Sequence, residues 1–246
     1  MVSVIIPTYN EESAIERTLA HLSRVHGDLE IIVADGESTD RTRARVESLI
    51  PTFPRPLRVI RAPRNRARQL NHAGREARGD TLLFLHADVI TPPDVVEAME
   101  QALAAGIHCG GNFDLVFEGE SAWNRAFTWA NRVRRRFGIY YGDSGIFVRR
   151  RVFERLGGFK TIPVMDDYEF IRRMERAGRT LCLPVTLKVS DRRWRRQGIP
   201  RTLLSWILVQ SLFSIGIPAE YLARFYAPVR EGKALFSHVQ ETSDCR

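Results

Sequence analysis

The chain has 246 residues, of which 44% are hydrophobic and 27% charged, and this composition argues against both a disordered chain and a multi-span membrane protein. Its three cysteines are scattered without a CxxC pair, which argues against a disulfide scaffold and suits a reducing cytosol. The net charge of +8 favours an anionic partner such as a nucleotide, a phospholipid surface or nucleic acid, although a plain basic surface accounts for it equally well.

Short apolar runs alternate with helical patterns through the first half of the chain. The apolar runs predict strands at residues 2–6, 31–34, 57–60 and 81–85, and the patterns between them predict helices at 11–24, 41–50 and 64–78. Fully apolar strands that alternate with helices are typical of a mostly parallel sheet flanked by helices. The N-terminus has no basic segment or cleavage site, so we expect no signal peptide and a cytoplasmic protein.

Polar residues follow three of these strands where each strand ends, at residues 8–12, 35–40 and 86–88. In an open parallel sheet, ligands bind at the carboxyl ends of the strands. Asp35 can accept a hydrogen bond from a nucleobase imide or a ribose hydroxyl, and Gly36 beside it allows a tight turn. Asp40 is instead expected to cap the next helix.

Asp88 follows the apolar strand at 81–85, with His86 two residues before it. A carboxylate in this position can hold a hard divalent cation, Mn²⁺ or Mg²⁺, that also binds diphosphate oxygens. The competing interpretation is that Asp88 caps the helix that Pro92 and Pro93 open. We prefer the interpretation that Asp88 binds a metal ion.

The second half of the chain is less regular, with strands predicted at 109–117 and 139–148 and helices at 120–136 and 166–178. Asp166 and Asp167 open the last of these helices. Carboxylates there can stabilise the helix dipole or accept a proton in a cleft, and the pattern does not choose between the two roles. No linker divides the chain, so we predict one domain at 1–199 and a helical extension at 200–246.

An apolar run at residues 203–217 lies within that extension. It is shorter than the roughly 20 residues of a membrane-spanning helix and is interrupted by Gln210 and Gly216. An amphipathic helix in peripheral contact with a membrane or packed on a partner explains it, and so does a plain core helix. The sequence of this run does not choose between a membrane contact, a partner contact and a core helix.

Taken together, these motifs resemble glycosyltransferase family 2 with the GT-A fold. The resemblance spans about residues 2–180 and rests on the opening strand at 4–11, a second motif at 32–40, a shortened DxD at 86–88, a turn at 157–159 and the acidic pair at 166–167. A narrower resemblance, through 66–71, 83–88 and 141–143, is to small bacterial transferases associated with radical SAM and selenium-related proteins. The chain departs from the family pattern at Ala34, His86 and Asp166.

The resemblance implies roles for individual residues. Asp167 would be the general base, Asp88 with His86 would hold the metal, and Asp35 would contact the base or ribose. Arg68 and Asn71 are added as donor contacts because their helix is cationic. The remaining candidates are the nucleotide-sugar contacts Pro7, Thr8, Tyr9, Glu11 and Ala87, and the acceptor or diphosphate contacts Asp166, Arg193 and Trp194, the last two in a segment similar to the QxxRW motif of processive synthases.

The resulting hypothesis is inverting, metal-dependent sugar transfer from a UDP- or GDP-sugar to a hydroxyl of an acceptor that the sequence does not identify. A nucleotidyltransferase is the first rival, but residues 7–11 lack the glycine-rich loop that such enzymes have. The second rival is a basic, non-catalytic binding protein. The arginine clusters at 132–136 and 192–196 favour this alternative. We expect no nucleic-acid partner.

Overall fold

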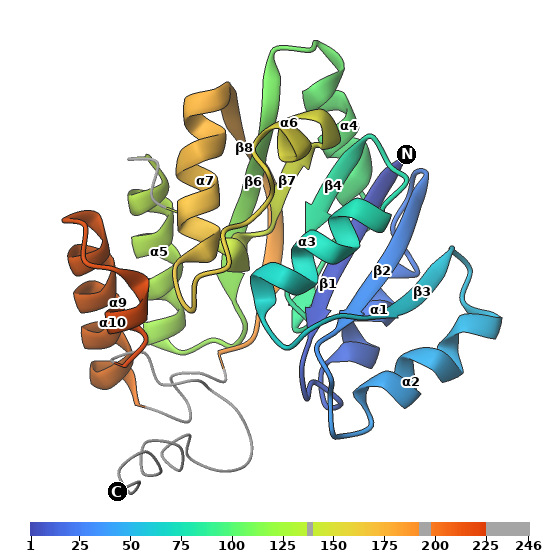
Figure 1. Ribbon diagram of the computed structural model, residues 1–246, viewed down its shortest axis with the longest axis horizontal. Coiled ribbons are helices and arrows are strands. Elements are labelled where there is room, and N and C mark those ends of the chain that lie inside the picture. Colours follow the sequence, from blue (N-terminus) through green and yellow to red (C-terminus); the bar gives the residue numbers. More distant parts are fainter. Residues whose placement is uncertain (137–139, 192–197, 225–246) are drawn as a thin grey trace, which may run out of the picture.

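The computed structural model describes residues 1–136, 140–191 and 198–224 (Figure 1). Within these residues an eight-stranded sheet has the order β3-β2-β1-β4-β7-β6-β8-β5. Strands β1 to β4 are parallel to one another, whereas β7 and β5 run against their neighbours. The prediction of a mostly parallel sheet flanked by helices is therefore confirmed. Arg193 and Trp194, which we predicted to contact the acceptor or the diphosphate, lie outside the described residues.

The first half of the chain follows the predicted strand and helix alternation. Its elements are β1 (Val2–Thr8), α1 (Ile15–Leu22), β2 (Leu29–Asp35), α2 (Thr42–Leu49), β3 (Leu57–Arg61), α3 (Arg66–Glu76) and β4 (Thr81–Phe84). Asp40 accepts a hydrogen bond from the backbone N–H of Thr42 at 2.9 Å, in the first turn of α2, as predicted for a capping residue.

The second half departs more from the sequence prediction. Its elements are β5 (Val89–Ile90), α4 (Val95–Ala104), β6 (His108–Phe117), α5 (Ala122–Arg136), β7 (Ile146–Arg149), α6 (Arg150–Arg155), α7 (Asp166–Ala177), β8 (Arg179–Val189), α9 (Ile199–Ser214) and α10 (Ala219–Leu222). The strand predicted at 139–148 begins only at Ile146, because Gly142–Ser144 form a 3₁₀ turn. Strand β8 was not predicted, since its polar and half-buried residues break the apolar pattern.

Helices cover both faces of the sheet because every buried strand has two apolar sides. In β1, Val4 and Ile6 pack with α1 and α4, while Ile5 between them packs with α3, α6 and α7 on the other side. Successive strand residues point to opposite faces, so a continuous apolar run demands two covering layers. Helices α3 and α7 cross in front of the sheet in Figure 1.

The C-terminal helices α9 and α10 lie beside α5, away from the central strands (Figure 1). Trp206 of α9 packs edge-on against Phe127 of α5. On the outward side of α9, Leu204, Ile207 and Ile215 are 69%, 61% and 75% exposed. Helix α9 therefore packs apolar side chains against α5 and exposes others to solvent, and the amphipathic extension stays a prediction.

No helix among residues 1–136, 140–191 and 198–224 combines the length and the apolar character needed to cross a membrane.

Candidate active site

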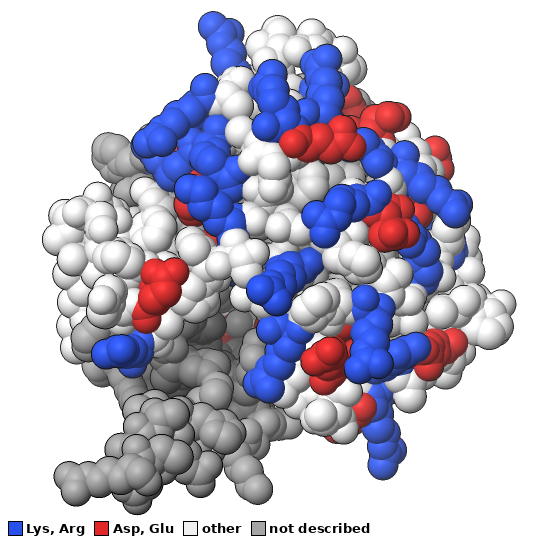
Figure 2. Space-filling view, in the orientation of Figure 1, with Lys and Arg blue, Asp and Glu red and all other residues white. Residues whose placement is uncertain are grey.

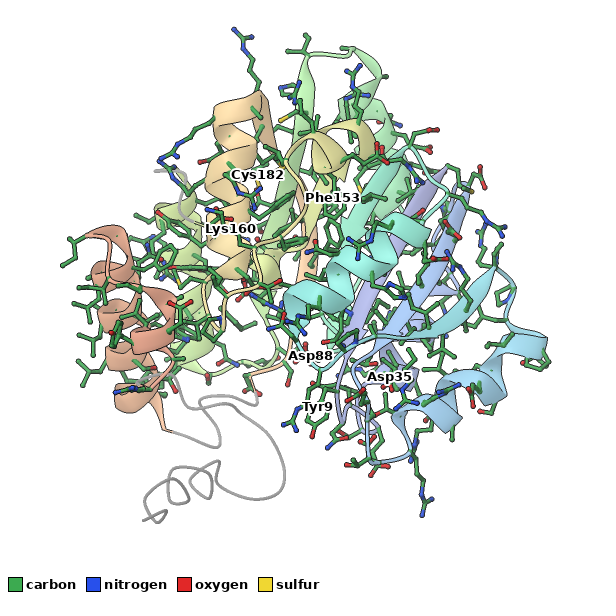
Figure 3. All side chains as sticks on the ribbon, in the orientation of Figure 1. Tyr9, Asp35, Asp88, Phe153, Lys160 and Cys182 are labelled. Atoms are coloured by element: carbon green, nitrogen blue, oxygen red, sulfur yellow. The ribbon has the colours of Figure 1, made fainter. Side chains whose placement is uncertain are left out.

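The carboxyl ends of β1, β2 and β4 meet at one edge of the sheet. The register of β1 and β2 sets Thr8 opposite Asp35, and the Thr8 hydroxyl donates to the Asp35 carboxylate at 3.3 Å. Figure 3 shows Tyr9, Asp35 and Asp88 gathered at this edge. Three segments that are far apart in the sequence therefore approach one another, as the strand pattern predicted.

A cavity of about 720 Å³ opens at this edge. Such a volume lies within the range of small-molecule and cofactor sites. One side is formed by residues that follow β1 and β4, and the other by α7 and the neighbouring helices α5 and α9. Nine of the predicted site residues line it, namely Pro7, Thr8, Tyr9, Glu11, His86, Ala87, Asp88, Asp166 and Asp167.

Three predicted donor contacts do not line the cavity. Asp35 is buried behind Thr8 and also accepts from the backbone N–H of Ser38. Arg68 is exposed, and the Asn71 amide exchanges two hydrogen bonds with the backbone of Phe159, at 2.7 and 2.8 Å. Neither Arg68 nor Asn71 is among the residues that line the cavity, so their donor contacts stay predictions.

The arginines of this segment that line the cavity are Arg64, just before α3, and Arg66, its first residue. The guanidinium of Arg64 lies 4.0 Å from the centre of the Tyr9 ring, which is stacking distance. Arg66 forms a two-pronged pair with Asp166, with Nε 3.0 Å from Oδ2 and Nη2 bonded to Oδ1. Its Nη2 also lies 3.2 Å from Asp167 Oδ2.

Asp167 is held in its ionised form by its surroundings. Burial alone would raise the pKa of its carboxyl, but the Arg66 cation and the N–H groups of Gly142 and Tyr168, each 2.8 Å away, outweigh burial and lower it. Asp166 differs, because there burial raises the pKa in spite of Arg66. The pair therefore holds one carboxylate that stays charged and one that is more easily protonated.

Gly142 is a site residue that the sequence reasoning did not assign. A Cβ there would lie 3.0 Å from Asp167 Oδ2 and 3.2 Å from His86 Nε2, so no larger residue fits between them without displacement. The available signal was the segment at 141–143, which carries part of the narrower family resemblance but indicates no role for Gly142. Arg66 was likewise quoted, within 66–71, but its partners lie 100 residues away in the sequence.

Asp88 lines the cavity, and its carboxylate is the kind of ligand that Mn²⁺ or Mg²⁺ prefers. Helix α4 starts at Val95 with Asp94 in the N-cap position, so Asp88 does not cap it. Among the described residues no group of three or more His, Cys, Asp or Glu could hold a metal. Mg²⁺ needs only one or two protein carboxylates when phosphates and water supply the rest. His86 fits less well, because its Nε2 lies 3.3 Å from Arg66 Nη1.

Gln69 ties the two strand ends of the site together. From α3, its Nε2 donates to the backbone oxygens of Thr8 and Ala34 at 2.7 and 2.8 Å, and the side chain is buried. Gly36 accommodates it, since a Cβ there would lie 2.7 Å from that Nε2. A polar side chain on the inner face of a helix is the sequence signal for such a contact.

Replacing Gln69 by Met should destabilise the protein by about 1–3 kcal/mol, because buried carbonyls lose a hydrogen-bond donor while the volume stays similar. Urea unfolding measures this change. Arg75→Met on the exposed side of α3 is the matched control and should shift the free energy of unfolding by less than about 0.5 kcal/mol. Equal effects of the two substitutions would contradict the role of Gln69.

Comparison with known proteins places this geometry among glycosyltransferases. The family model described as "Glycosyl transferase family 2" matches residues 3–157. A dolichol-phosphate mannosyltransferase of Pyrococcus furiosus is 35% identical over 111 residues, which cover 43% of this chain and 30% of the relative. An undecaprenyl-phosphate 4-deoxy-4-formamido-L-arabinose transferase of Pseudomonas aeruginosa is 28% identical over 163 residues, or 61% of this chain and 46% of the relative. The chain thus spans less than half the length of either relative.

Solved structures agree on the fold. The mannosyltransferase PcManGT of Pyrobaculum calidifontis, solved with GDP-Man and Mn²⁺, superposes with a TM-score of 0.68 at 26% identity, covering 91% of this chain and 69% of that one. TarS of S. aureus, solved with UDP-GlcNAc, reaches 0.62 at 19% identity, with coverages of 77% and 58%. The fold is of the GT-A type.

Proposed function

Because the chain belongs to glycosyl transferase family 2, we propose that it moves a sugar, of hexose type, from a nucleoside-diphosphate donor to an acceptor hydroxyl with inversion at the anomeric carbon. The observation that carries this proposal is the cavity itself. It joins a donor side, built from the ends of β1 and β4, to a buried carboxylate pair at the start of α7.

On the donor side, Pro7, Thr8, Tyr9, Glu11 and Ala87 would surround the nucleotide, with Asp35 acting from behind Thr8. The donor is a UDP- or GDP-sugar, in line with the molecules bound in the PcManGT and TarS structures. Asp88 would hold Mn²⁺ or Mg²⁺. When bound, this ion neutralises the charge that develops on the departing diphosphate.

On the acceptor side, Asp167 would accept the proton of the acceptor hydroxyl. The hydroxyl oxygen then forms a bond to the anomeric carbon while the bond from that carbon to the diphosphate oxygen breaks, and its electron pair leaves with the nucleoside diphosphate. Arg66 orients Asp167, because two of its nitrogens bond to Asp166 and one of these two also contacts Asp167. Asp166 would fix Arg66 and border the acceptor.

Peripheral contact of α9 with a membrane, through 203–217, is part of this proposal. Residues 202–219 carry no charged side chain, and the outward side of α9 exposes leucine and isoleucine. In Figure 2 the lobe at the left, where Figure 1 draws α9 and α10, is mostly white beside a face rich in lysine and arginine. The protein would act at the cytoplasmic side. The association with radical SAM and selenium-related proteins is likewise a proposal, supported by the motifs at 66–71, 83–88 and 141–143.

Isothermal titration of UDP and GDP, each with and without Mn²⁺, tests the donor half of the proposal. We expect one of the two to bind at least tenfold more tightly with Mn²⁺, because Asp88 would hold the ion and the ion would neutralise charge on the diphosphate. Magnesium in place of manganese shows which ion serves. If neither nucleotide binds, while nonspecific polyanions bind in a salt-dependent way, the chain is a basic binding protein on a transferase fold.

A further inference from the structure

His86 follows β4, two residues before Asp88, and both residues line the cavity. The Nε2 atom of His86 lies 3.3 Å from Nη1 of Arg66. A guanidinium group has only N–H donors and keeps its charge, so Nε2 is the hydrogen-bond acceptor in this contact. An imidazole that accepts through Nε2 is neutral and carries its proton on Nδ1. The partner of His86 therefore fixes both its charge and its tautomer.

In this tautomer the imidazole of His86 is a poor metal ligand. A histidine ligates a metal through a nitrogen lone pair. Here the lone pair of Nε2 faces Arg66, and Nδ1 carries the proton. A divalent cation at Nε2 would also lie close to the guanidinium charge, and like charges repel. Asp88 offers a carboxylate to the same cavity, so the two ends of the shortened DxD motif differ in what they can bind.

Arg66 connects His86 to the acidic pair at the start of α7. Its Nε and Nη2 form one edge of the guanidinium group, and both bond to Asp166. Two parallel bonds along one edge leave the guanidinium plane able to tilt about that edge. The third nitrogen, Nη1, contacts His86 and fixes this tilt. The tilt in turn sets the contact of Nη2 with Asp167 Oδ2, at 3.2 Å.

The neutral charge of His86 suits this position. An aspartate there, as in a complete DxD motif, would be a third carboxylate in competition for the charge of Arg66. A neutral acceptor holds Nη1 and leaves that charge to Asp166 and Asp167. Gly142 keeps the two sides close together, because a Cβ there would lie 3.2 Å from His86 Nε2 and 3.0 Å from Asp167 Oδ2.

We propose that His86 is a positioning residue rather than a metal ligand, and that it holds Arg66 in the orientation that aligns Asp167 with the acceptor hydroxyl. This inference rests on the proposed function, because it assigns a role within the same site. A chain of contacts then runs from the end of β4, beside the carboxylate that would hold the metal ion, through Arg66 to the carboxylate that would accept the proton.

Isothermal titration of UDP and GDP into His86→Leu, with and without Mn²⁺, tests whether His86 ligates the metal. For the nucleotide that binds wild type, the ratio of the two dissociation constants should stay within about twofold of the wild-type ratio, because the carboxylate of Asp88 remains. Asp88→Ala is the reference variant, in which this response to Mn²⁺ should be lost.

Release of nucleoside diphosphate from the matching sugar nucleotide tests the positioning role. His86→Leu should lower kcat at least about tenfold while the KM of the donor stays within about threefold, because a displaced catalytic group slows the reaction more than it weakens binding. His86→Gln should recover most of the lost turnover, since its Oε1 can accept from Arg66. His26→Leu, an exposed histidine outside the cavity lining, is the control and should change kcat less than about twofold.

Loss of the response to Mn²⁺ in His86→Leu would make His86 a metal ligand and overturn the proposal. Unchanged turnover in His86→Leu, or equal losses in His86→Leu and His86→Gln, would show that the acceptor for Arg66 has no positioning role. A wild-type protein that binds neither nucleotide, or releases none from the sugar nucleotides, would instead count against the proposed function.

Discussion

Replacing Asp167 by Asn should lower turnover by about 10²–10⁴-fold while leaving nucleotide affinity within about twofold, because general-base help of this size is lost and the donor side is untouched. Asparagine has nearly the same shape as aspartate, and its amide oxygen can still accept from the Gly142 N–H. Steady-state kinetics with the donor identified by titration measure the change in turnover.

Asp166→Asn is the matched control, since it removes the neighbouring carboxylate and frees Arg66. We expect a smaller loss than for Asp167→Asn. A larger loss would assign the base to Asp166, and unchanged turnover in Asp167→Asn would remove the general base from the mechanism. Because the pKa of Asp167 is lowered, its ionised form is retained down to acidic pH, so this group should not make turnover rise between pH 6 and 8.

Replacing Asp88 by Ala should abolish the effect of Mn²⁺ on nucleotide binding, with an expected loss of at least tenfold in affinity measured with the metal. The reason is that Asp88 is the carboxylate at the end of β4 that lines the donor side, where phosphate oxygens would complete the coordination. Isothermal titration with and without Mn²⁺ measures the change. Binding without metal should alter little.

Asp94→Ala provides the control, because it removes an exposed carboxylate six residues farther on, outside the cavity lining. Its nucleotide affinity should keep the full response to Mn²⁺. Were Asp88→Ala to retain that response, the metal would be held elsewhere or not be needed. A loss of stability with unaltered metal dependence would point to a purely structural role for Asp88.

Much of the first half of the fold could be predicted from local pattern, since β1, β2, β3 and β4 are apolar along their length and are separated by helical periodicity. The second half could not. Strand β8 mixes polar and half-buried residues because it lies near the edge of the sheet, so its strand character depends on pairing with β6. Local pattern also could not show that the Asn71 amide bonds to the backbone of Phe159, which lies 88 residues away.

The sequence by itself determined the order of the elements and the edge at which the polar segments after β1, β2 and β4 gather, because both follow from local hydrophobicity and from the parallel direction of the strands. Only the tertiary structure decided which arginine pairs with which aspartate. Arg66 meets Asp166 across 100 residues, while Arg134 faces the cavity and its neighbours Arg132 and Arg135 bind Asp114. Arginines look alike along a chain, and the pKa and binding role of each group depend on charges and burial that arise only when distant segments pack together.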